Sequence, residues 1–369
     1  MASPLRRQIG QLLIGSLPGT TITPEMRSLA REFQLGGVTL FKRNIEAPEQ
    51  VAELNHDLQS LSSELPLWVA VDQEGGRVAR LHAPFTEWPP MATLGRSGDD
   101  KLAYRFAAAL AMELKAVGIT LDYAPVLDIH TNPRNPIIGD RALGEDAETV
   151  ASLGAAVIRG FQDNGVAACG KHFPGHGDTS VDSHLALPIV EHPPDRIRRV
   201  ECVPFREAIR NDVAFMMTAH ILVPALDEQR PATLSPTIVR GMLREELGFQ
   251  GVILSDDLEM KALADTYTVP EAAVQAIAAG CDGVLVCRHL SSDRSQDAEV
   301  QAAVLETLVH AIEDGRIPYK RAEDALSRNR RAKERFLTAP VVPGRGALLR
   351  EVLGNDTHRR IADEMARFL

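Results

Sequence analysis

The sequence predicts an α/β fold, and within that class a single (β/α)8 TIM-type barrel with a short C-terminal helical tail. Short apolar segments alternate with helical segments along the chain, a pattern typical of a parallel sheet. There are eight such apolar segments, and eight βα units close into a barrel. They are near-continuous runs of Val, Ile and Leu, as expected for strands buried on both faces. No G-x-G-x-x-G follows the first of them, which disfavours a dinucleotide-binding fold.

Each predicted strand is a short apolar run bounded by polar, glycine or proline residues. Arg6 and Arg7 precede the first run as they would in a signal peptide, but Gln8 and Gln11 interrupt its apolar character, so we interpret it as a strand. The runs lie at residues 9–17, 36–41, 66–71, 119–127, 166–171, 213–218, 251–255 and 283–287.

Helices are predicted from apolar periodicity and from residues that favour helix ends. Thr23 and Pro24 begin one helix as N-cap and first helical residue, and Asn164-Gly165 ends another. Pro204 is expected to disturb a third. The predicted helices span 24–33, 48–63, 99–117, 145–163, 195–211, 236–247, 270–279, 295–314 and 319–336.

Residues 1–337 are predicted to form the catalytic barrel, and residues 338–369 a linker and a C-terminal helix. The linker is rich in proline and glycine. In the helix predicted over 357–369, Ile361, Met365 and Phe368 lie on one side. We expect this side to dock on the barrel or on a second subunit.

The chain has 369 residues, of which 44% are hydrophobic and 24% charged, an ordinary globular composition. Its formal net charge is −10, and no basic stripe appears, which argues against a nucleic-acid partner. No segment predicts a transmembrane span. The cysteines show no C-x-x-C spacing and are predicted to be buried free thiols in a reducing cytoplasm: Cys169, Cys202, Cys281 and Cys287.

Polar residues follow most of the predicted strands at their C-terminal ends. In a barrel these ends form one face, and active sites lie on that face. We therefore expect one polar mouth built from Asp72, Asp128, Lys171, His172, His220, Asp256, Asp257, Arg288 and His289.

The densest group of titratable residues lies at 171–184, directly after the fifth strand. Its glycines and proline rule out regular structure, so we predict a polar loop on a rigid strand end. Asp182 precedes His184 by two residues and can orient its imidazole, which gives a general acid/base unit. An Asx-turn beside a solvated histidine is the alternative interpretation. Lys171 can donate to substrate hydroxyls, pair with an acid, or do both.

Asp256 and Asp257 end the seventh strand, and we expect them to face this loop. A carboxylate at that place can be a nucleophile, a base, a metal ligand or a helix cap. Arg80 and Arg141 lie on the loops after the third and fourth strands. Each can present a fork of donors to hydroxyls or to a carboxylate, or be solvated.

A metal site is a competing interpretation of the histidine loop. H-x-x-x-H on a glycine-containing loop is not a rigid ligand pair, and the H-x-H signature of many barrel metallohydrolases is absent after the first strand. His176, flanked by glycines, is compatible with a mobile side chain that has no role. A metal-dependent barrel hydrolase and a sugar-binding barrel without catalysis remain alternatives. The candidate metal ligands are His172, His176, Asp178, Asp182 and His184.

Four motifs, in order, resemble those of the family-3 glycoside hydrolases, in particular the bacterial β-N-acetylhexosaminidases of peptidoglycan recycling. The motifs lie at residues 72–80, 139–144, 171–184 and 251–258, and they read DQEGGRVAR, GDRALG, KHFPGHGDTSVDSH and GVILSDDL. The resemblance spans about residues 8–335.

This resemblance implies a retaining exo-β-N-acetylglucosaminidase that acts on muropeptide fragments in the cytoplasm without a metal or organic cofactor. Asp256 corresponds to the nucleophile, His184 to the general acid/base and Asp182 to its partner. Glu259 stands where many relatives have a small residue. No nucleic acid or membrane partner is implied, and we expect a monomer or weak homodimer. The matched residues that hold the N-acetylglucosamine unit are Asp72, Arg80, Arg141, Lys171 and His172.

A retaining glycosidase usually places two carboxylates ~5–5.5 Å apart. Here a histidine on a glycine-containing loop takes the place of the second carboxylate, and such a loop can deliver the acid once substrate is bound. An imidazole does not repel an incoming anion as a carboxylate would. A β-N-acetylglucosaminide phosphorylase is therefore a further alternative.

Overall fold

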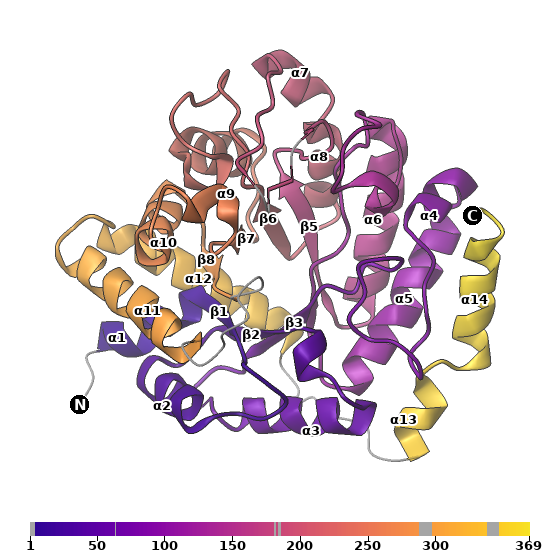
Figure 1. Ribbon diagram of the computed structural model, residues 1–369, viewed down its shortest axis with the longest axis horizontal. Helices are drawn as coiled ribbons and strands as arrows, with labels where there is room; N and C mark the ends of the chain where they lie inside the picture. Colours follow the sequence, from indigo (N-terminus) through magenta and orange to yellow (C-terminus); the bar gives the residue numbers. More distant parts are fainter. Residues whose placement is uncertain (1–3, 63, 181, 184–185, 288–296, 338–346) are drawn as a thin grey trace.

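Eight parallel strands form a closed barrel in the computed structural model (Figure 1). The structure describes residues 4–62, 64–180, 182–183, 186–287, 297–337 and 347–369. Neighbouring strands pair in sequence order, and β8 pairs with β1 to close the barrel. The predicted (β/α)8 barrel is confirmed. The strands are β1 (Leu13–Ser16), β2 (Gly37–Leu40), β3 (Trp68–Val71), β4 (Leu121–Asp122), β5 (Ala167–Phe173), β6 (Phe215–Thr218), β7 (Val252–Asp257) and β8 (Gly283–Leu285).

Helices surround the barrel and cover the outer face of the sheet (Figure 1). The 3-10 helices are η1 (Gly10–Leu12), η2 (Lys42–Asn44), η3 (Gly139–Arg141) and η4 (Ala232–Leu234), and η5 (Thr237–Glu246) is a π-helix. The α-helices are α1 (Pro4–Ile9), α2 (Pro24–Phe33), α3 (Pro48–Gln59), α4 (Ala92–Ser97), α5 (Asp100–Ala116), α6 (Ala147–Asp163), α7 (Pro194–Arg199), α8 (Cys202–Arg210), α9 (Lys261–Ala264), α10 (Val269–Ala279), α11 (Asp297–Glu313), α12 (Tyr319–Phe336), α13 (Ala347–Val352) and α14 (Asp356–Ala366).

Polar side chains begin several of these helices. The hydroxyl of Thr23 accepts a hydrogen bond from Met26 N at the start of α2, which has the predicted bounds. Asp99 caps α5 and Asp146 caps α6 in the same way. These caps satisfy backbone N–H groups that the first helical turn leaves unpaired. The helix ends are therefore encoded locally, before any tertiary packing.

The first predicted strand is partly wrong. Residues 9–17 contain the end of α1 and all of η1, and only Leu13–Ser16 forms β1. Ile9 and Leu12 are fully buried here in helical turns. A short apolar run satisfies a buried helical turn as well as a buried strand, so periodicity alone does not separate the two.

Two proline effects also alter the predicted elements. The segment 119–127 contributes only Leu121–Asp122 as β4, because Pro125 has no N–H with which to continue the ladder. The segment 195–211 forms two helices, α7 and α8, and the break precedes Pro204. Proline fits the first turn of α8, where a backbone donor is not needed.

Alternate strand residues pack on opposite sides of the sheet, as the two-residue period of a strand requires. In β3, Trp68 belongs to the cluster that fills the barrel interior, whereas Val69 belongs to the layer under the helices. The ring of Trp68 meets that of Phe215 edge-on across the interior, at 5.1 Å between centroids. These two rows of side chains decide which residues reach the mouth of the barrel.

The C-terminal tail docks on the barrel's own helices, one of the two predicted possibilities. Figure 1 shows α14 lying along α5 at the edge of the molecule. Ile361 and Met365 are buried and join the main hydrophobic core. The carboxylate of Glu113, in α5, accepts hydrogen bonds from His358 Nδ1 (2.7 Å) and Gly354 N (2.9 Å). The linker predicted over 338–346 lies outside the described residues.

Candidate active site

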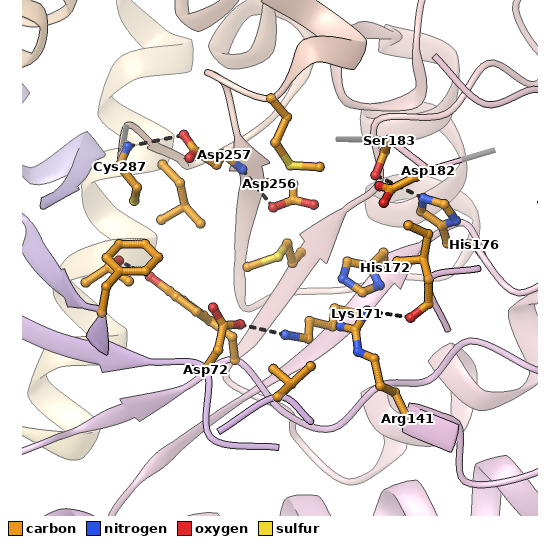
Figure 2. Close-up of a pocket in the computed structure, with 18 of the residues that line it drawn as sticks. Asp72, Arg141, Lys171, His172, His176, Asp182, Ser183, Asp256, Asp257 and Cys287 are labelled. Carbon is orange, nitrogen blue, oxygen red and sulfur yellow. Dashed lines mark hydrogen bonds and ion pairs between the residues drawn. The ribbon is translucent and has the colours of Figure 1, made fainter. Parts of the chain in front are cut away.

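One cavity of about 250 Å³ opens at the C-terminal ends of the strands (Figure 2). It is lined by side chains that follow or end several strands, as predicted for the barrel mouth. His184, Arg288 and His289, which were also predicted there, lie outside the described residues. The predicted site residues that line the cavity are Asp72, Arg80, Arg141, Lys171, His172, Asp182 and Asp256.

The inward-facing rows of the strands lead directly to three of these residues. Asp72 follows Trp68 and Ala70 at the two-residue spacing, and Lys171 follows Ala167 and Cys169 in β5. Asp256 follows Val252 and Leu254 in β7 in the same way. Because alternate residues of a strand share one face, all three side chains emerge above the barrel interior.

Ion pairs fix the positively charged side chains on one wall of the cavity. Lys171 Nζ lies 2.9 Å from Asp72 Oδ1 and 2.7 Å from Glu74 Oε1. Arg141 donates to both oxygens of Glu74, each at 2.8 Å, and Arg80 lies 3.3 Å from Asp72. Lys171 therefore forms the predicted salt bridge while still lining the cavity. Glu74 is within a motif singled out in the sequence, but was not predicted as a site residue.

Burial and ion pairing act in opposite directions on this network. Burial alone would raise the pKa of Asp72, but Lys171 and Arg80 hold it well below the usual range. The pKa of Glu74 is lowered against the same burial by Arg141 and Lys171. Burial would lower the pKa of Lys171, and the two acids raise it instead. All these groups are therefore charged near neutral pH, and their donors are held in place before substrate arrives.

Asp128 anchors the start of the histidine loop. It is fully buried, and its Oδ2 lies 2.6 Å from His172 Nδ1. Its Oδ1 accepts a 2.6 Å hydrogen bond from His176 N. Burial opposes ionisation, but His172 and these hydrogen bonds lower the pKa of Asp128. Because Asp128 is an ionised acceptor, His172 carries a proton on Nδ1.

His176 is buried and both of its ring nitrogens have partners, so the interpretation of a mobile side chain is wrong. Its Nδ1 lies 2.8 Å from Thr179 Oγ1, and its Nε2 lies 3.3 Å from Ser183 Oγ. Burial lowers the pKa of His176 to about 4, even though Asp128 favours the charged form. The ring is therefore neutral at pH 7 and joins the base of the loop to its far end.

The far end of the loop contacts α9, the short helix that follows the strand carrying Asp256. Ser183 O accepts a 3.1 Å hydrogen bond from Ala262 N, at the start of α9. Asp182 and Asp256 both line the cavity, and Figure 2 shows them on facing sides of it. The loop after β5 and the end of β7 are thus brought together over one cavity.

The two aspartates that end β7 point in different directions. Asp256 points into the cavity and accepts a 2.8 Å hydrogen bond from Asp257 N (Figure 2). Asp257 turns into the wall, where its Oδ1 accepts from Cys287 N and Glu259 N, each at 3.2 Å. Burial and the charge of Glu259 raise the pKa of Asp257 to about 7. Of the two carboxylates, Asp256 is the one that points into the cavity.

Among the residues that the structure describes, no three histidine, cysteine or acidic side chains converge as metal ligands would. None of the described helices has both the length and the apolar character needed to cross a bilayer. The described cysteines are all free and buried.

Comparison with known proteins decides the family. The family model for the glycosyl hydrolase family 3 N terminal domain matches residues 4–332. The chain belongs to glycosyl hydrolase family 3. The resemblance inferred from the four motifs, and the enzyme class of glycoside hydrolase, are confirmed.

Several relatives are named β-hexosaminidase. "Beta-hexosaminidase A" of Pseudoalteromonas piscicida is 35% identical over 367 residues, which cover 94% of this chain. This family-3 chain spans only 60% of that relative's length. A "Beta-hexosaminidase" of Nitrosomonas eutropha is 38% identical over 324 residues, which cover 86% of this chain and 90% of the relative.

Solved structures of the family share the fold. A family 3 β-N-acetylglucosaminidase from Paenibacillus sp. str. FPU-7 matches with a TM-score of 0.92 and 42% identity, covering 100% of this chain and 69% of that one. NagZ from Neisseria gonorrhoeae, solved in complex with N-trifluoroacetyl-D-glucosamine, matches with a TM-score of 0.77 and 31% identity, covering 97% of both chains.

Proposed function

We propose that this family-3 chain is a retaining exo-β-N-acetylglucosaminidase. The observation that carries the proposal is the facing arrangement of Asp256 and Asp182 across one cavity whose cations are already fixed by ion pairs. The β-hexosaminidase names of its relatives support this substrate class. A cavity of about 250 Å³ is smaller than the ~300–1,000 Å³ typical of sites for drug-sized ligands. This size favours a single terminal sugar over an extended chain.

In the proposed mechanism, Asp256 attacks the anomeric carbon and forms a covalent glycosyl-enzyme intermediate. His184, oriented by Asp182, protonates the leaving oxygen, then removes a proton from the water that releases the sugar. Lys171 and Arg141 donate to the sugar from the fixed wall. None of these steps needs a metal or an organic cofactor.

We further propose muropeptide fragments as the natural substrates and peptidoglycan recycling in the cytoplasm as the setting. Support comes from the motif resemblance and from the similarity to NagZ from Neisseria gonorrhoeae over nearly the full length of both chains. The ligand in that structure, N-trifluoroacetyl-D-glucosamine, is consistent with an N-acetylglucosamine unit in the cavity.

The proposal is tested by trapping the nucleophile. An activated 2-fluoro sugar of the gluco configuration should label Asp256, and peptide mass spectrometry should find the adduct on that residue. The Asp256→Ala variant should lose at least ~1,000-fold in turnover of an aryl β-N-acetylglucosaminide, because no covalent intermediate can form. Near-normal turnover by this variant, or labelling of another carboxylate, would refute the assignment.

A further inference from the structure

Asn135 lies in the loop after β4 and uses both ends of its side-chain amide. Its Oδ1 accepts hydrogen bonds from Ile137 N and Ile138 N, each at 2.9 Å. Its Nδ2 donates to His176 O at 2.8 Å and Gly177 O at 3.0 Å. The side chain is buried, so these hydrogen bonds are shielded from water. One amide therefore joins two active-site loops.

The first of these loops leads to a sugar-binding candidate. Ile138 directly precedes η3, which contains Arg141. Arg141 lines the cavity and is fixed there by Glu74. The turn that Asn135 closes on its own loop is thus the turn that places Arg141.

The second loop leads toward the proposed acid/base pair. Asn135 Nδ2 also lies 3.3 Å from Thr179 Oγ1, which in turn lies 2.8 Å from His176 Nδ1. The opposite nitrogen of His176 contacts Ser183 Oγ at 3.3 Å. Ser183 is the neighbour of Asp182 in the chain, and His184 follows it in sequence. A displacement at Asn135 is therefore transmitted through one buried imidazole to the residues beside Asp182.

The start of the β5 loop is packed so closely against the β4 loop that it cannot shift on its own. A Cβ atom added to Gly177 would lie 1.7 Å from the carbonyl oxygen of Ile129, so the two backbones touch directly. Asp128, immediately before Ile129, holds His176 N from the other side. The height of the loop above the cavity is thus set by the β4 loop rather than by the glycines of the β5 loop.

We propose that Asn135 is a positioning residue for proton transfer to the leaving group, because it fixes the β5 loop relative to the loop that carries Arg141. This inference rests on the proposed function, which places the general acid on the β5 loop. Asn135 itself does not line the cavity. Its effect is exerted through His176 and Thr179.

The sharpest perturbation is Asn135→Asp. The side chain keeps its shape, and its Oδ1 can still accept hydrogen bonds from Ile137 N and Ile138 N. The NH2 group is replaced by a charged oxygen that faces the carbonyl oxygens of His176 and Gly177. Because donors become acceptors, the hydrogen bonds from Asn135 to the β5 loop are lost while the local turn is preserved.

The assay compares aryl and alkyl β-N-acetylglucosaminides whose leaving groups differ in basicity. A poor leaving group must be protonated as the bond breaks, whereas a dinitrophenolate departs without an acid. For Asn135→Asp, we expect kcat/KM to fall ~100-fold for the most basic leaving groups and less than ~3-fold for dinitrophenol. A plot of log kcat/KM against leaving-group pKa should therefore steepen relative to the wild type.

Asn55→Asp is the matched control. Asn55, in α3, is equally well buried and donates to Val117 O at 2.7 Å, but it does not line the cavity. The same chemical change there should alter all substrates by a common factor and leave the slope unchanged. If circular dichroism shows that Asn135→Asp does not fold, Thr179→Val serves as a second variant, because it removes the hydroxyl that contacts both Asn135 and His176. It should steepen the plot in the same direction.

A folded Asn135→Asp or Thr179→Val variant with the wild-type slope would overturn the inference. Failure of the proposed function has a different result, since the wild type would then not hydrolyse these substrates or Asp256→Ala would retain activity. The two ideas are thus tested by separate measurements.

Discussion

Replacing Glu74 with Gln tests whether the charge network holds the cationic wall of the cavity together, the wall proposed to bind the sugar. Glu74 is 2% exposed and binds two cations, Arg141 and Lys171, at 2.7–2.8 Å. An amide of the same shape keeps one acceptor oxygen but presents an NH2 group to one of these cations. Of the two acids that pair with Lys171 among the described residues, Asp72 is then the one that remains. Removing one partner of a buried ion pair typically costs ~3–5 kcal/mol, because it leaves an uncompensated charge.

The pH dependence of this loss in the free energy of unfolding follows from the pKa of Glu74. Burial alone would raise that pKa, but Arg141 and Lys171 hold it below the usual range. A carboxyl with a lowered pKa stabilises the fold fully above its unfolded-state pKa of ~4.3, and this stability is lost as pH falls through the folded-state value. The difference between wild type and Glu74→Gln should therefore be complete at pH 7 and shrink below about pH 4.

Urea denaturation followed by circular dichroism measures the free energy of unfolding at pH 7 and below about pH 4. Steady-state kinetics with an aryl β-N-acetylglucosaminide measures the effect on KM, which should rise because Arg141 and Lys171 lose their fixed positions. Glu246→Gln is the matched control, since Glu246 pairs with Arg198 at 2.8 Å but both side chains are 38% exposed. Such a surface pair contributes at most ~1 kcal/mol. Equal losses in the two variants, with KM unchanged, would refute the reasoning.

Three further predictions concern stability, the loop and the acceptor. Burial lowers the pKa of Lys333 to about 7 from 10.5, so the unfolded chain binds its proton more tightly and stability rises with pH between these values. Lys333→Met should raise the free energy of unfolding at pH 7 by about 3 kcal/mol, at ~1.4 kcal/mol per pKa unit less the hydrogen bond to Gln11, and this gain should vanish near pH 10 in urea titrations. Gly177→Ala should lower kcat/KM more than ~10-fold, because its Cβ collides with Ile129 O, whereas Gly19→Ala, with open space around it, should match the wild type. In phosphate buffer, a sugar 1-phosphate should form beside the free sugar, as mass spectrometry of the products will detect; free sugar alone at every phosphate concentration contradicts this.

The architecture could be predicted from the sequence because each element is encoded locally. The apolar runs, the caps at Thr23 and Asp99, and the polar strand ends each depend on a few neighbouring residues. The misassigned segments are those in which local signals are ambiguous. The apolar run at 9–17 fits a helical turn as well as a strand, and Pro125 ends β4 early although the residues around it are apolar.

The candidate site likewise contains residues that the sequence can predict and residues that it cannot. Residues carried by the strands have a fixed direction, so the row Val252, Leu254, Asp256 indicates which of the two aspartates reaches the cavity. In the sequence, the two-residue spacing already places Asp256 and Asp257 in opposite rows. The structure adds which of the two rows faces the barrel interior.

Glu74 and Asn135 could not be predicted in this way, because their contacts depend on where loops from different strands meet. Glu74 pairs with Arg141, which lies 67 positions away in sequence, and Asn135 binds the loop at His176, 41 positions away. No local pattern encodes such pairs. Both residues are buried and lie outside the proposed bond-making step. Glu74 holds Arg141 and Lys171 directly, whereas Asn135 acts through His176 and Thr179. If positioning in this site is shared by two such residues on separate loops, then Glu74→Gln should act mainly on KM and Asn135→Asp mainly on leaving-group dependence. A variant that combined both changes should show both effects, and any departure from additivity would measure the coupling through Arg141, which pairs with Glu74 and donates to Ile137 O in the turn that Asn135 closes.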